Sequence, residues 1–138
     1  LHRVLVVQKR AIRALTGLNC RESCKEAFKE QKILTVVALY ILETIMHAVT
    51  SNQTRLANQH HYNTRNRHNF LLDSHHLSLY EKKPSYKGTM LFNMLPDHLK
   101  TLPVRNLKTA TKNWLLQQSI YSVKEFLDWR NNATTEHP

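Results

Sequence analysis

ILTVVALYILETIMHAV, residues 33–49, is the most hydrophobic stretch of this 138-residue chain. The run from Val36 to Leu42 is apolar on every side, so we expect a helix at the centre of the fold. Thr35 can cap this helix at its start. Glu43 and His47 interrupt the stretch before it reaches the roughly 20 apolar residues that cross a bilayer. It therefore predicts a buried helix and no membrane span.

Two further helices are predicted before this stretch. The first covers residues 2–16, and Gly17 follows it where a left-handed C-terminal cap is favoured. The second begins near Ser23, which forms a capping box with Glu26. The apolar side of the first helix comprises Leu5, Ile12 and Leu15, with Val4, Ala11 and Leu18 alongside.

The second half of the chain predicts shorter elements. A helix is expected from Tyr86 to Leu95, a single turn over 97–102, and an amphipathic helix over 107–118 with Leu107, Ala110, Trp114 and Leu115 toward a core. Leu77 and Leu79 suggest a short extended segment. A second capping box, Ser122 with Glu125, opens a helix that ends at Trp129.

These patterns and the scarcity of glycine, with 2 residues, favour an all-α fold over a turn-rich β fold. We predict a small helical bundle in residues 1–50 and a polar linker in 51–69, which is rich in Asn and His. A segment of short packing helices is expected in 70–129, and a polar tail in 130–138.

The charge of the chain points to polyanionic partners. It has 20 Lys and Arg against 10 Asp and Glu, a formal net charge of +10. RNA, DNA or an acidic membrane face could attract such a chain, and the alternative is a soluble basic protein with none of these partners. Cys20 and Cys24 do not make a disulfide framework, and no secretory signal opens the chain, so we expect an intracellular protein, nuclear or cytoplasmic.

Several strings, taken in order, give the chain a resemblance to a known family. They are QKRAIR (8–13), CRESCKEAF (20–28), ILTVVALYILE (33–43), YNTRNRHN (62–69), LSLYEKKPSYKGTMLFNMLP (77–96) and YSVKEFL (121–127). In this order and spacing they resemble the C-terminal end of the polymerase protein of non-LTR retrotransposons, the jockey-like and related LINE elements. No single string is specific, but the ordered set spans residues 4–127.

The resemblance implies a post-catalytic, thumb-adjacent region of a reverse transcriptase, an RNA-directed DNA polymerase. The family's catalytic carboxylates lie in a palm domain that precedes this region. Here Asp73, Asp97 and Asp128 are isolated in the sequence, whereas two-metal polymerase chemistry needs clustered carboxylates. We therefore expect a non-enzymatic fragment whose partners are RNA or DNA and the catalytic part of the parent polymerase.

Three groups of residues are candidate nucleic-acid contacts. Basic residues on the first helix can meet phosphates, while an aromatic ring among Arg or Lys side chains can bind single strands. The groups are Arg3, Lys9, Arg10 and Arg13; then Tyr62, Arg65 and Arg67; and then Lys82, Lys83 and Lys87 near Tyr80 and Tyr86. The alternatives are a solvated helix face for the first group and an unstructured linker for the second.

Other chemistries fit the sequence poorly, and we expect no cofactor. Gly17 and Gly88 are too far apart for a phosphate-binding loop. Cys20 and Cys24 supply half of a zinc site, but the His60/His61 and His75/His76 pairs are adjacent residues and give no matching second half. No residue marks either thiol as a nucleophile.

Two other interpretations remain open. In one, the chain is a domesticated or decayed fragment that binds other proteins through an apolar surface formed by Trp114, Tyr121, Phe126 and Trp129. In the other, the reading frame is a relic without a selected function.

Overall fold

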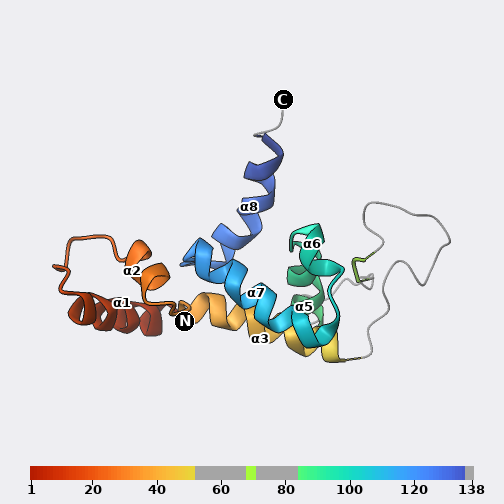
Figure 1. The fold of residues 1–138 in the computed structure, drawn as a ribbon, viewed down its shortest axis with the longest axis horizontal. Coiled ribbons are helices and arrows are strands. Elements are labelled where there is room, and N and C mark those ends of the chain that lie inside the picture. The colour runs from red at the N-terminus through yellow and green to blue at the C-terminus, as the bar shows by residue number, and fades with distance from the viewer. Residues whose placement is uncertain (52–67, 71–83, 136–138) are drawn as a thin grey trace. The chain divides into compact units, whose positions relative to one another are not determined.

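The fold is built from helices. The computed structural model describes residues 1–51, 68–70 and 84–135, and every regular element in these ranges is an α-helix. In chain order they are α1 (His2–Thr16), α2 (Lys25–Glu30), α3 (Val36–Thr50), α5 (Pro84–Asn93), α6 (Asp97–Lys100), α7 (Val104–Gln118) and α8 (Val123–Thr135) (Figure 1). The all-α prediction is confirmed. The linker in 51–69 and the extended segment at Leu77 and Leu79 fall almost wholly outside the described residues.

The chain forms two units, one of which joins distant parts of the sequence. One unit comprises residues 1–40 and 111–138, and the other comprises residues 41–110. The units follow the packing of the helices, whereas the predicted divisions near residues 50 and 70 follow changes in composition. At the C-terminal end, α8 continues to Thr135. This helix is longer than predicted, since we expected a polar tail after Trp129.

The hydrophobic stretch forms α3, as predicted. The Thr35 hydroxyl caps the helix by accepting the backbone N–H of Ala38 at 3.0 Å, and it also donates to the carbonyl of Ile120. Six apolar side chains of α3 are buried: Val37, Ala38, Ile41, Leu42, Ile45 and Ala48. Leu39 is an exception to the expectation of burial on every side, because it is exposed.

In the unit formed by residues 1–40 and 111–138, α1 and α2 pack together (Figure 1). The buried core there is Ile12, Cys24, Ala27 and Phe28, with Leu18, Ile33 and Tyr121 partly buried against it. Gly17 caps α1 in the left-handed conformation, with φ 73°, as predicted.

The predicted apolar side of α1 is wrong in part. Leu5 and Ile12 are buried, but Val4 and Leu15 are exposed, because α1 has apolar residues on two sides.

The two predicted capping boxes behave differently. At Ser122 the hydroxyl accepts the backbone N–H of Glu125 at 3.1 Å, which is one half of a box. The Glu125 carboxylate accepts the N–H of Tyr121 at 3.4 Å, one residue before the cap. The box at Ser23 is wrong. Cys24 occupies the cap position of α2 and makes no side-chain capping hydrogen bond.

In the unit formed by residues 41–110, α5 lies against α3 at Gly88. A Cβ atom added to Gly88 would lie 2.4 Å from the carbonyl oxygen of Thr44 and 2.5 Å from the Cβ of Ala48. The two helices therefore approach each other more closely than any side chain at this position allows. A glycine that the sequence presents as a weak point in a helix is required by the packing.

A polar contact holds the segment at residues 68–70 to α5 and α6 in the same unit. The Asn93 side chain accepts the N–H of Phe70 at 2.7 Å and donates to its carbonyl at 3.0 Å. The ammonium group of Lys100, which is 2% exposed, donates to Asn69 Oδ1 at 2.6 Å and to the carbonyl of Asn93 at 3.0 Å. The same ammonium forms an ion pair with Asp97, whose Oδ1 lies 3.4 Å from Lys100 Nζ. A lysine is almost never fully buried unless it is paired in this way.

Candidate nucleic-acid interface

The four basic residues predicted on the first helix differ in their exposure to solvent. Arg3 and Arg10 are exposed, whereas Lys9 and Arg13 are half-buried. The Nε of Arg13 donates to the backbone carbonyl of Glu22 at 3.0 Å, so this guanidinium holds the turn between α1 and α2. Only Arg3 and Arg10 of this group extend into solvent without such a contact in the described residues.

The ammonium of Lys9 lies over the ring of Tyr121, 4.1 Å from its centroid, and that of Lys25 lies 4.8 Å from the same centroid. Cation–π contacts of this kind contribute roughly 0.5–1 kcal/mol each at exposed sites. The Tyr121 hydroxyl contacts the Sγ of Cys24 at 3.3 Å. Burial and this hydrogen bond raise the pKa of Tyr121 well above its usual range, so the phenol stays protonated. Lys9 thus belongs to a packed cluster around Tyr121.

The other predicted contacts fall mostly on residues that the structure does not describe. Tyr62, Arg65, Arg67, Lys82 and Lys83 lie outside the described ranges, and their proposed role stays a prediction. Lys87 is half-buried on α5, in the unit formed by residues 41–110.

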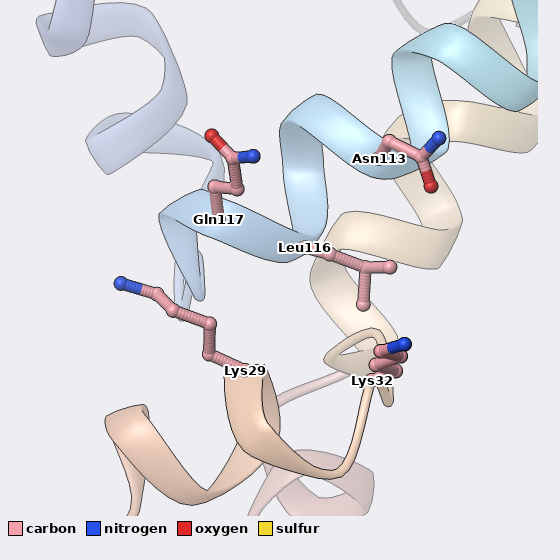
Figure 2. A pocket seen from close by; sticks show the side chains of 5 residues that line it. All are labelled: Lys29, Lys32, Asn113, Leu116 and Gln117. Carbon is pink, nitrogen blue, oxygen red and sulfur yellow. The ribbon is translucent and has the colours of Figure 1, made fainter.

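A pocket between α2 and α7, which local sequence patterns do not reveal, brings cationic and amide groups together. It has a volume of about 380 Å³ and is lined by Lys29, Lys32, Asn113, Leu116 and Gln117. We refer to it as the Lys29–Lys32 pocket. Figure 2 shows the two lysines on the rim formed by α2 and the turn after it, and the other three residues on α7 opposite. These three α7 residues share one helix face because of their i, i+3, i+4 spacing.

The electrostatics of the pocket are cationic. No carboxylate lines it among the described residues. Lys29 forms an ion pair with Glu26 at 3.5 Å, in which the Glu26 side chain is 77% exposed. Such exposed pairs contribute little and are readily exchanged for another anion. Lys32 is exposed, and its side chain makes no hydrogen bond or ion pair within the described residues. The pocket therefore presents two ammonium groups to an incoming anion.

Lys32 adopts a backbone conformation that normally favours glycine. Its φ is 55°, because it follows α2 at the left-handed position of a Schellman motif. The N–H of Lys32 bonds to the carbonyl of Lys29 at 3.2 Å, and the N–H of Ile33 bonds to that of Phe28 at 3.0 Å. A non-glycine residue in this conformation costs roughly 1 kcal/mol. The turn thus keeps a charged side chain at the pocket at the expense of stability.

The four aromatic residues of the alternative apolar docking surface are partly or fully buried. Phe126 is fully buried, and Trp114 packs edge-on against it and against Trp129, with ring centroids 6.0 and 5.2 Å apart. Tyr121 is covered by the two lysines described above. The rings of Trp114, Phe126 and Trp129 thus pack against one another, in agreement with the prediction that Trp114 faces a core.

The zinc alternative gains no support from the described part of the chain. Cys20 is exposed and Cys24 is buried. Within residues 1–51, 68–70 and 84–135, no three His, Cys, Asp or Glu side chains are grouped so that they could hold a metal ion. Among the described helices, none is both long and apolar enough to cross a bilayer.

Comparison of the chain with protein-family models, with curated proteins and with solved structures finds no match.

Proposed function

We propose that this chain binds nucleic acid, as a non-catalytic C-terminal region of a non-LTR retrotransposon reverse transcriptase that grips template RNA or target DNA. The observation that carries the proposal is the Lys29–Lys32 pocket, which offers ammonium, amide and apolar groups within one hollow. The ordered strings that resemble the family and the net charge of +10 support it.

Each group that lines the pocket suits one part of a nucleotide. The ammonium groups of Lys29 and Lys32 can contact phosphate oxygens, which supply affinity that depends on salt. The amides of Asn113 and Gln117 carry both donors and acceptors, as the edges of bases require. Leu116 points from α7 toward the turn that carries Lys32 (Figure 2), where it gives an apolar contact for a base or sugar. A single strand, whose bases are unstacked, fits this combination better than a duplex.

The unit that holds the pocket also carries most of the charge of the described residues. Residues 1–40 and 111–135 contain more than twice as many Lys and Arg as Asp and Glu. Long-range attraction of this sign raises the rate at which a polyanion meets the surface. Arg3 and Arg10 remain candidates for further phosphate contacts, and variants at these positions test that prediction separately.

The proposal is tested by fluorescence anisotropy with labelled single-stranded RNA, duplex RNA and duplex DNA over a salt series. We expect salt-dependent binding that weakens in the double variant Lys29→Ala/Lys32→Ala. The log–log salt slope for single strands should become shallower by about 0.7 for each lysine–phosphate pair that the substitutions remove. Arg3→Ala/Arg10→Ala measures the contribution predicted from the sequence.

The matched control removes two positive charges elsewhere. Lys108 and Lys124 are both exposed and neither lines the pocket, so Lys108→Ala/Lys124→Ala should retain most of the affinity. Equal losses in the two double variants would mean that net charge alone drives binding. Absence of binding at low salt would rule out the proposed function.

A second prediction separates binding from stability at one residue. Lys32→Gly is expected to raise the free energy of unfolding by about 1 kcal/mol, because glycine adopts the left-handed conformation without strain. The same change should weaken RNA binding. Lys32→Ala is the control, since it loses the charge but keeps the strain and should not stabilise the fold. Urea denaturation measures the first effect, and a stability unchanged in Lys32→Gly would contradict our interpretation of the turn.

A further inference from the structure

Helix α1 exposes an apolar stripe on the side away from the core. Leu1, Val4, Val7 and Leu15 are 55%, 55%, 63% and 65% exposed, and Ala11 and Ala14 are exposed as well. Single exposed apolar residues are common on protein surfaces, but a contiguous row of them marks a site of interaction. We refer to Val4, Val7, Ala11 and Ala14, with Leu1 and Leu15 beside them, as the outer stripe.

The spacing of the outer stripe is that of a coiled-coil seam. Val4, Val7, Ala11 and Ala14 repeat in steps of three, four and three residues, which places them at successive a and d positions of two heptads. Arg3 and Arg10 then occupy both g positions, next to the seam, and both are exposed. Charged residues at g positions select the partner helix and its orientation by pairing with residues of opposite charge.

The opposite side of α1 is already occupied. Leu5 and Ile12 are buried in the unit, and the Gln8 amide donates to the carbonyl of Leu34 and accepts the N–H of Val36, at 2.9 and 2.8 Å. The helix is therefore fixed in rotation, and the outer stripe cannot turn inward. A rigid helix that presents a seam needs less ordering when a partner binds.

We propose that the outer stripe is a docking surface for one amphipathic helix of a partner protein, which carries acidic residues opposite Arg3 and Arg10. Charge complementarity identifies this occupant, because α1 contains no Asp or Glu at all. The small side chains of Ala11 and Ala14 let a second helix approach closely at the C-terminal half of the seam.

Two other occupants fit the stripe less well. A second copy of the chain would bring its own arginines and a net charge of +10 to the same interface, and like charges beside a seam are repulsive. An anionic membrane favours helices that bury large side chains such as Trp, Phe and Leu on the apolar side, whereas the four positions of the seam are only Val and Ala. A helix with acidic flanks satisfies both the seam and the arginines.

The test uses two synthetic helical peptides of about three heptads as probes. Both carry the same leucine seam, and one has Glu and the other Lys at the positions beside it. We expect the acidic peptide to bind the full chain 1:1 in isothermal titration calorimetry and the basic peptide to bind at least tenfold more weakly. Arg3→Glu/Arg10→Glu should reverse this preference. Val7→Ser/Leu15→Ser should weaken the binding of both peptides at least tenfold, since these exposed residues belong to the outer stripe and not to the core.

The remaining outcomes each decide against the proposal. Equal binding of the two peptides, or no preference reversal in Arg3→Glu/Arg10→Glu, would show that the arginines do not select the partner. Dimerisation that Val7→Ser abolishes would assign the stripe to a second copy, and tighter binding to phosphatidylserine vesicles than to the acidic peptide would assign it to a membrane. Lys29→Ala/Lys32→Ala should leave peptide binding intact while RNA binding falls, so failure of this proposal is distinguishable from failure of the proposed function.

Discussion

Substitution of Gly88 by alanine is expected to lower the free energy of unfolding by about 3 kcal/mol, as overpacking of a tight contact does. Two effects oppose each other here. Alanine has a higher helix propensity than glycine by about 1 kcal/mol, which favours the variant. The new Cβ would lie 2.4 Å from the Thr44 carbonyl oxygen and 2.5 Å from the Ala48 Cβ, so α3 and α5 must move apart, and that cost is the larger one. Urea denaturation monitored by circular dichroism measures the difference.

Two further variants test whether the contact with α3 is the cause. Ala48→Gly in the Gly88→Ala background removes one of the two clashes, and it should recover part of the stability despite the poor helix propensity of glycine. Gly17→Ala is the comparison for backbone strain, because nothing lies within 4 Å of an added Cβ there and only the φ of +73° opposes it. Its cost should be about 1 kcal/mol. A Gly88→Ala variant as stable as the parent chain would show that the two helices separate without loss.

Local signals in the sequence predict the helices well but not which sides they bury. The apolar run, the Thr35 cap and the Gly17 cap each depend on neighbouring residues, and all three are present in the structure. On α1 the apolar residues cover two sides, so periodicity alone does not decide which side is buried, and it places Val4 and Leu15 on the wrong one. The importance of Gly88 is hidden in the sequence because it depends on a helix about 40 positions earlier in the chain.

The candidate site is harder to predict, since it joins residues that are distant in sequence. In the sequence Lys29 and Lys32 resemble ordinary surface lysines. Only the packing of α7 beside α2 shows that they line a pocket. In the sequence Lys9 and Arg13 are candidates for phosphate contacts, but in the structure Lys9 lies over the Tyr121 ring and Arg13 donates to the Glu22 carbonyl. The one local feature of the site is the turn after α2, in which Lys32 follows the C-cap residue Gln31 at a position where glycine is favoured.

Substitution of Lys100 by methionine is expected to cost about 3 kcal/mol in the free energy of unfolding, because the charge-assisted hydrogen bonds of a buried ammonium disappear. The Lys100 ammonium donates at 2.6 Å to Asn69 Oδ1 and at 3.0 Å to the Asn93 carbonyl, inside a region where its side chain is 2% exposed. Methionine has a similar length and fills the space, but it has no donor. The two oxygen atoms would lose this donor in a place where water replaces it poorly.

Lys108→Met is the matched control, since this lysine also pairs with a carboxylate. Lys108 lies 3.1 Å from Glu43, but both side chains are 54% exposed, so its removal should cost less than about 1 kcal/mol. The difference between the two variants measures what burial of the ammonium and its hydrogen bonds to Asn69 and Asn93 contribute beyond an exposed lysine–carboxylate pair. Equal, small costs would mean that the Lys100 ammonium is hydrated in solution. A large cost at Lys100 alone would show that a residue that looks like surface charge in the sequence holds residues 68–70 against α5 and α6.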